Sequence, residues 1–80
     1  MRLMTEFSSQ QLDVKGLSCP LPILRAKKAL SALQSGQTLE VLATDGGAWD
    51  DFEYFCQHSG HVLMERAQSD GVYRFLIRRK

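Results

Sequence analysis

The sequence predicts an α+β fold, a two-layer sandwich in which a four-stranded mixed sheet carries two helices on one face. Apolar patterns follow one another along the 80 residues in the order β-α-β-α-β-β. A strand–helix–strand unit within one sheet places its two strands parallel through a right-handed crossover. The turn signal Ser69-Asp70-Gly71 joins the last two strands into an antiparallel hairpin. These observations leave the order of the strands in the sheet open.

The first half of the chain predicts a strand over residues 11–15 and a helix over residues 20–34. Apolar and polar side chains alternate in the strand, which is typical of a half-buried strand, and Gly16 ends it. In the helix, apolar residues recur at spacings of three and four, which predicts one buried face. That face comprises Ile23, Ala26, Leu30 and Leu33, widened by Leu24 and Ala29. Gly36 suits the left-handed conformation just past the end of a helix.

The second half of the chain predicts three more strands and a second helix. The strands are expected over residues 38–44, 61–68 and 72–79, and the helix over residues 48–59. A turn, Asp45-Gly46-Gly47, precedes the helix, and Gly60 ends it. The helix carries an apolar stripe that is expected to face the core: Trp49, Phe52, Phe55 and Cys56. Two strand faces are expected to meet it: Leu39, Val41 and Ala43, and Tyr73, Phe75 and Ile77.

Length and composition indicate one small domain. We expect residues 10–80 to form it, after a flexible tail over residues 1–9. The net charge of +1 indicates neither a nucleic acid nor a membrane as the partner. No apolar run approaches the length of a membrane span, and residues 1–7 lack the apolar stretch of a secretory signal. Two cysteines are too few for a disulfide scaffold, so we expect a cytoplasmic protein.

Cys19 stands directly before Pro20 and Pro22, where the first predicted helix begins. Proline suits the first helical position, so Pro20 there makes Cys19 the N-cap residue or its neighbour. Free backbone N–H groups and the positive end of the helix dipole then stabilise a thiolate, the reactive form of cysteine. Basic residues surround this segment and favour the same form: Lys15, Arg25, Lys27 and Lys28. The three on the helix form either a docking face for an acidic partner or an ordinary solvated face.

Four roles for Cys19 compete. A buried structural cysteine is disfavoured, because a helix tip beside a proline is a surface position. A thioredoxin-like redox site needs the pattern Cys-x-x-Cys, and Pro22 takes the place of its second cysteine. A metal site would draw on Cys19, Cys56, His58 and His61, but the paired cysteines of the usual zinc site are missing. A thiol that carries a persulfide sulfur or an acyl group needs one exposed cysteine and no local resolving thiol, which fits best.

The motif residues resemble a known signature. Leu12-Asp13, Gly16 and Cys19-Pro20-Leu21-Pro22 match Leu-Asp-x-x-Gly-x-x-Cys-Pro-x-Pro of the TusA/SirA-like sulfur-carrier family. Residues 39–45 and 70–78 are similar to the family's second strand and closing hairpin, so the resemblance covers residues 11–80. It implies the β-α-β-α-β-β fold and a sulfurtransferase-type carrier rather than a stand-alone enzyme. Many members have Asp-Pro where this chain has Asp45-Gly46, which leaves the subfamily open.

The resemblance also implies roles for residues. Cys19 accepts a persulfide sulfur from a cysteine desulfurase or a rhodanese and relays it to an acceptor protein. The pathway is tRNA 2-thiouridine synthesis in some members, and molybdenum-cofactor, sulfur-oxidation, selenium or thiosulfate metabolism in others. No cofactor and no metal are implied. The motif residues support the site, with Asp13 expected to cap the loop and Gly16 to permit the turn: Asp13, Gly16, Pro20 and Pro22. Candidate docking residues for the donor are Arg25, Lys27 and Lys28.

The alternative function is a small redox-sensing or RNA- or protein-binding regulatory module. Arg74 and Arg78 on the last strand motivate it, although charged side chains also protect sheet edges. An RNA platform stacks bases on exposed aromatic side chains. Tyr73 and Phe75 instead share the face that is predicted to be core. We therefore expect no direct nucleic-acid binding and no membrane association, and we prefer the sulfur carrier.

Overall fold

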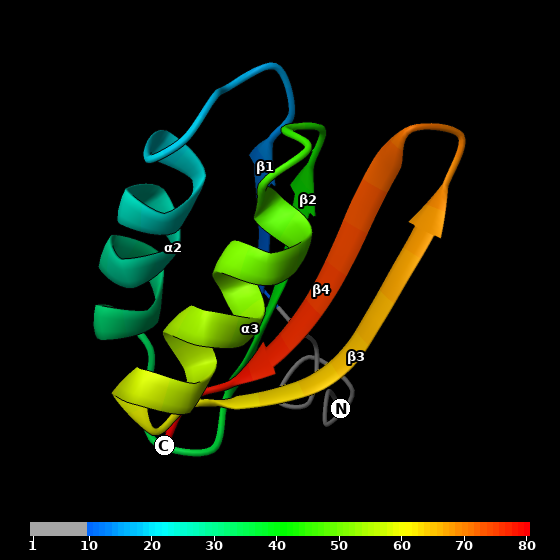
Figure 1. Ribbon diagram of the computed structural model, residues 1–80. Coiled ribbons are helices and arrows are strands. Elements are labelled where there is room, and N and C mark those ends of the chain that lie inside the picture. Colours follow the sequence, from blue (N-terminus) through cyan, green and yellow to red (C-terminus); the bar gives the residue numbers. More distant parts are fainter. Residues whose placement is uncertain (1–9) are drawn as a thin grey trace, which may run out of the picture.

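The elements of the chain follow one another in the predicted order (Figure 1). The structure is a computed structural model that describes residues 10–80, so the tail predicted over residues 1–9 lies outside the described residues. The elements are β1 (Gln10–Val14), α2 (Leu21–Ser31), β2 (Thr38–Ala43), α3 (Ala48–Ser59), β3 (Val62–Ser69) and β4 (Val72–Arg78). The predicted α+β class is confirmed. Within residues 10–80, no helix has the length and apolar character needed to cross a membrane.

The four strands form one mixed sheet in the order β1-β2-β4-β3. β1 and β2 are parallel, with Val14 beside Ala43, as expected for two strands that a helix connects. β4 runs antiparallel between β2 and β3, so that Phe75 lies between Val41 and Arg66. β4 occupies an inner position because its inward side chains are apolar and buried, whereas most residues of β3 are exposed, as suits an edge strand.

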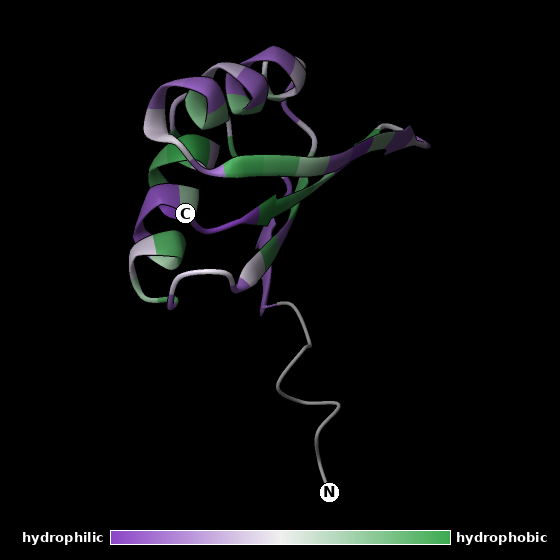
Figure 2. Ribbon diagram, turned by 90° about the horizontal axis from the view of Figure 1, so that it is seen from below, coloured by the Kyte–Doolittle hydropathy of each residue, from purple (hydrophilic) through white to green (hydrophobic). Residues whose placement is uncertain are grey.

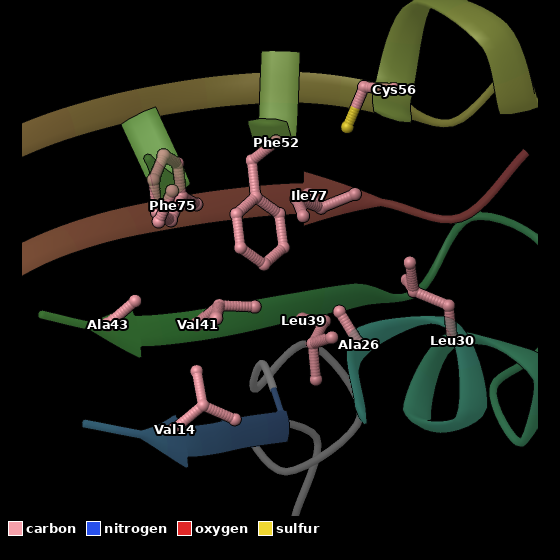
Figure 3. Close-up of a cluster of buried hydrophobic side chains, with 11 residues drawn as sticks. Val14, Ala26, Leu30, Leu39, Val41, Ala43, Phe52, Cys56, Phe75 and Ile77 are labelled. Atoms are coloured by element: carbon pink, nitrogen blue, oxygen red, sulfur yellow. The ribbon is translucent and has the colours of Figure 1, made fainter. Parts of the chain in front are cut away.

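Both helices cover the same face of the sheet, and the core lies between the two layers (Figure 1, Figure 2). The core residues are Val14, Ala26, Leu30, Leu39, Val41, Ala43, Ala48, Phe52, Cys56, Phe75 and Ile77. Figure 3 shows the Phe52 ring of α3 directed at the sheet, where it stacks on Phe75 with ring centroids 4.5 Å apart. Full burial of one such side chain contributes roughly 1.5–3 kcal/mol. This contact therefore fixes α3 on the sheet.

Helix α2 is shorter than predicted at both ends. Pro20 is its N-cap residue, with φ −100° and ψ 14°, so the prediction that Pro20 is the first helical residue is wrong. At the other end, the N–H of Leu33 bonds three residues back to the carbonyl of Leu30, which tightens and ends the helix. Leu24 is 52% exposed. Its predicted place on the buried face is wrong, because it lies on the outer side of α2.

Helix α3 has the predicted bounds. Gly60 follows it as a left-handed C-cap with φ 89°, where glycine is favoured. Trp49 is half-buried rather than fully buried, and the guanidinium of Arg66 lies 4.2 Å from the centroid of its ring. Arg66 also donates hydrogen bonds of 3.1 Å to the Trp49 carbonyl and to Glu53. Trp49 thus joins α3 to the β3–β4 hairpin, a structural role.

The face of the sheet opposite the helices carries an ion-pair network. Arg74 donates to Glu65 at 3.0 Å and also to Glu40, which accepts a further bond from Gln11 at 2.9 Å. These hydrogen bonds, from Gln11 first and then Arg74, lower the pKa of the Glu40 carboxyl group. Leu76 lies half-buried on the same face. Because Arg74 pairs with two carboxylates of its own sheet, it is poorly placed to bind phosphate, which disfavours the RNA-binding alternative.

Candidate functional site

The loop between β1 and α2 places Cys19 at one edge of the sheet. It leaves β1 through Gly16, whose φ of 83° lies in the left-handed region that favours glycine. Asp13 Oδ1 accepts a hydrogen bond of 3.0 Å from the N–H of Lys15, so this side chain caps the end of the strand. The N–H of Gly16 donates to Oγ1 of Thr44 at 2.9 Å. The loop is thus held at the edge where the parallel strands β1 and β2 both end.

Cys19 is exposed and lies one residue before the N-cap of α2. The N–H of Leu21 donates to the carbonyl of Ser18 at 2.9 Å, which folds the chain tightly around the thiol. Pro22 is the second residue of the helix and is buried. It stands in the first turn, where the missing N–H costs no intrahelical hydrogen bond. The two prolines therefore begin the helix at a defined point and leave the thiol outside it.

A groove of about 480 Å³ runs between α2 and α3 and begins at Cys19. Each helix follows one strand of the parallel pair, so the two helices run in the same direction and their first turns meet at one edge of the sheet (Figure 1). The α2 side of the groove comprises Cys19, Pro20, Ile23 and Lys27. The α3 side comprises Asp51, Tyr54, Phe55, His58 and Ser59. The lining is mainly apolar, and its charged side chains are Lys27 and Asp51.

The charges that act most on Cys19 are negative. Partial desolvation raises the pKa of the Cys19 thiol, and the carboxylates of Asp51 and Asp45 raise this pKa further. The start of α2 acts in the opposite sense, because it stabilises a thiolate. The sequence analysis expected Lys15, Arg25, Lys27 and Lys28 to favour the thiolate, but none of them is among the groups that shift the pKa of Cys19. The acidic groups were not foreseen, because only the parallel arrangement of the two helices brings the first turn of α3 to the thiol.

Tyr54 and His58 form the outer wall of the groove. Their rings stack with centroids 3.9 Å apart, and Tyr54 is 63% exposed. His58 Nδ1 lies 2.9 Å from the carbonyl oxygen of Tyr54. A carbonyl oxygen can only accept, so Nδ1 is the donor, and Nε2 of the neutral ring is left as an acceptor. His58 was considered in the sequence only as a metal ligand and Tyr54 not at all, because spacing along one helix does not reveal which helix lies opposite.

The second cysteine, Cys56, lies in a different environment. It is 5% exposed, and Figure 3 shows its sulfur among the core side chains beneath α3. Burial raises its pKa to about 11. The structure also does not bring the four candidate metal ligands together, since Cys19 and His58 line the groove, Cys56 lies in the core and His61 lies beyond α3. Among residues 10–80, no group of three such side chains is placed to hold a metal ion.

The outer side of α2 presents apolar and basic side chains next to Cys19. Leu21 and Leu24 are 41% and 52% exposed, although leucine side chains are usually buried. The predicted docking residues are all exposed on the same helix: Arg25, Lys27 and Lys28. Only Lys27 lines the groove. Helical spacing of three and four residues places Leu21, Leu24 and Lys28 on one stripe.

Known proteins resemble this chain over nearly its whole length. The family model described as Sulfurtransferase TusA matches residues 10–79. The chain belongs to the TusA family. A protein of Neisseria meningitidis is 58% identical over 73 residues, which cover 91% of this chain and 99% of that protein. The sulfur carrier protein TusA of Allochromatium vinosum is 53% identical over 70 residues, which cover 88% of this chain and 92% of the relative.

A solved structure confirms the fold of this TusA-family chain. The crystal structure of a SirA-like protein from Desulfitobacterium hafniense matches with a TM-score of 0.76 at 30% identity. The match covers 85% of this chain and 93% of that one. The resemblance drawn from the motif residues is thereby confirmed at the level of the family and of the β-α-β-α-β-β architecture.

Proposed function

We propose that this chain is a sulfur carrier, that residues 10–80 are its carrier domain, and that Cys19 holds the sulfur as a persulfide. The observation that supports this best is one exposed thiol at the tip of α2, in a chain whose other cysteine is buried. Without a second thiol in reach, a persulfide on Cys19 cannot collapse into an internal disulfide. Relatives in Allochromatium vinosum and Pseudomonas putida bear the name sulfur carrier protein TusA, which supports the proposal.

The transfer is a thiol–persulfide exchange. The sulfur of Cys19, as the thiolate, attacks the outer sulfur of the donor's persulfide. A new sulfur–sulfur bond forms on Cys19 as the donor's bond breaks, and the donor cysteine leaves as a thiolate that takes up the proton lost by Cys19. The reverse exchange with an acceptor thiol empties the carrier. No external oxidant or reductant is needed, because the same sulfur–sulfur linkage is passed along.

Cysteine desulfurases and rhodaneses form enzyme-bound persulfides, so we propose one of them as the donor. The acceptor is a downstream protein with a thiol of its own. This acceptor leads either to tRNA 2-thiouridine or to another sulfur pathway. The groove beside Cys19 gives a partner's sulfur-bearing segment a surface to lie against, with apolar lining from Ile23 and Phe55.

Leu21, Leu24, Arg25, Lys27 and Lys28 form the proposed docking surface for the donor. Exposed leucines provide apolar contact area, and the three cations favour an acidic partner. We expect Leu24→Glu to slow sulfur loading several-fold, because it places a negative charge in an apolar contact without touching Cys19. Met64→Glu on β3 is the matched control, since Met64 is 48% exposed but lies on the edge strand. An equal loss of loading rate in both variants would contradict the assignment of this docking surface.

Intact-mass spectrometry after incubation with a cysteine desulfurase and cysteine tests the carrier function. The wild-type chain should gain about one sulfur atom, and a reductant should remove it. Cys19→Ser should fold normally and gain none, while Cys56→Ser should still gain it. A rhodanese with thiosulfate is tested alongside the desulfurase, because the proposal admits either class of donor.

Two results contradict the proposal. One is normal loading of Cys19→Ser, which places the sulfur elsewhere. The other is no gain from either donor while the Cys19 thiol remains open to alkylation, which favours the redox-sensing alternative.

A further inference from the structure

Asp51 lies across the groove from Cys19, in the first turn of α3. Both residues line the groove, one from each helix. Asp51 is half-buried, whereas its neighbour Asp50 is exposed and does not line the groove. Together with partial desolvation, the negative charge of the Asp51 carboxylate raises the pKa of the Cys19 thiol. Two residues that are 32 positions apart in sequence therefore form one local pair.

The Asp51 carboxylate has no basic partner within residues 10–80. The ion pairs of this part of the chain involve other carboxylates, those of Asp13, Glu40, Glu53 and Glu65. Asp45 has a backbone partner instead, because its Oδ2 accepts a hydrogen bond of 3.1 Å from the N–H of Gly47. No ion pair within residues 10–80 neutralises the charge of Asp51, so this charge acts on the sulfur across the groove.

Two positively charged or titratable groups also line the groove, but they stand farther along it. His58 follows Asp51 by seven residues, which is about 10 Å along the helix axis. Lys27 lies in the second turn of α2, whereas Cys19 precedes the N-cap residue of that helix. Asp45, in the turn before α3, acts in the same sense as Asp51. Asp51 is therefore the charged group of the groove that dominates at Cys19.

We propose that Asp51 is a positioning residue whose charge, across the groove, keeps the sulfur of the empty carrier protonated, as a thiol. The inference rests on the proposed function of Cys19 as the carrier residue. The thiol is exposed, so a free thiolate there would react with any oxidant or electrophile that reached it. Holding the proton on Cys19 limits such side reactions. The sulfur then becomes nucleophilic chiefly when a docked partner changes the surroundings of Asp51.

The test is the pH dependence of Cys19 alkylation by iodoacetamide, followed by peptide mapping. Asp51→Asn removes the charge and keeps the shape, so the midpoint of the rate profile should move to lower pH. At pH 7 the rate should rise about twofold to fivefold, because the larger thiolate fraction is partly offset by weaker nucleophilicity. Asp50→Asn is the matched control, since it removes the same charge from the same helical turn. It should leave the profile where it is in the wild type.

A rescue variant separates charge from packing. Asp51→Glu restores the carboxylate and should return the rate toward that of the wild type. Unfolding curves of all three variants show whether each one is folded under the assay conditions. The proposal is overturned if Asp51→Asn keeps the wild-type midpoint, if Asp50→Asn shifts it equally, or if Asp51→Glu reacts as fast as Asp51→Asn. Alkylation needs no sulfur donor, so this result does not depend on whether loading succeeds.

Discussion

The two cysteines of this chain show how position decides the use of one side chain. Cys19 precedes α2 and is exposed beside a groove, while Cys56 lies in α3 and is 5% exposed. Both thiols have a raised pKa, but for different reasons. Burial alone raises that of Cys56, to about 11. At Cys19, partial desolvation acts together with carboxylates that a partner or a mutation can change.

The contrast teaches that a raised pKa alone does not make a cysteine inert. Cys56 belongs to the core cluster with Phe52 and Ile77 and is only 5% exposed, so a donor has little access to its sulfur. The sulfur of Cys19 is open to a partner. Partial desolvation first, and then the carboxylates of Asp51 and Asp45, raise the pKa of its thiol. Accessibility thus separates the carrier thiol from the structural one, and local charge then tunes the carrier thiol.

The largest expected effect is on the alkylation rate. In the native protein at pH 8, we expect iodoacetamide to modify Cys19 at least about 100-fold faster than Cys56. The reason is that Cys56 reacts only when α3 opens away from the sheet. Site-resolved peptide mapping over time measures both rates in one sample. In denaturant the two rates should become nearly equal, and a large difference that persists there would place its origin in the local sequence rather than in the fold.

A smaller effect is expected on the free energy of unfolding. Cys56→Ser should lower it by about 1–3 kcal/mol, because a buried hydroxyl group must find a partner in an apolar core. Cys19→Ser should change it by less than about 0.5 kcal/mol, since the side chain is exposed. Urea unfolding of both variants and the wild type provides the comparison. A larger loss in Cys19→Ser than in Cys56→Ser would reverse the roles assigned here.

The smallest expected effect is a pH dependence of the difference in unfolding free energy between the wild type and Cys56→Ser. The Cys56 pKa is about 11 in the folded chain and 9.0 in the reference state. Between these values the folded state binds more protons than the unfolded state, so stability falls as pH rises. Below pH 9 the contribution of the protonated Cys56 thiol to the stability of the folded state is fully present. The stability gap between the wild type and Cys56→Ser should therefore narrow from pH 8.5 to pH 11, by on the order of 1–2 kcal/mol.

Urea titrations at several pH values measure this gap. Cys19 ionises in both proteins and cancels from the difference. A gap that stays constant up to pH 11 would show that burial does not set the ionisation of Cys56.

Local signals in the sequence were sufficient for most of the fold. The bounds of α3 follow from its apolar stripe and from Gly60, and both are properties of neighbouring residues. The hairpin follows from Asp70 and Gly71, which adopt the left-handed φ values of 52° and 79° that a two-residue turn requires. The motif around Cys19 likewise identified the family, because all of its residues lie in one short stretch of the chain, residues 12–22.

Features that depend on tertiary contacts were not predicted. The strand order depends on which strand best fills an inner position, and Phe75 and Ile77 decide this only once the layers pack. Leu24 was expected to be buried, because helical spacing alone does not show how wide the covered face of α2 is. The effect of Asp51 on Cys19 was missed since it arises from two parallel helices whose starts meet at one sheet edge.

The most direct test of the account is to map sulfur on both cysteines of the wild-type chain after loading by a persulfide donor under native conditions. Peptide-resolved mass spectrometry reports the occupancy of each site. The account predicts reductant-sensitive sulfur on the Cys19 peptide and none on the Cys56 peptide. Sulfur on Cys56, or equal sulfur on both, would contradict the claim that exposure at the tip of α2 selects the carrier thiol.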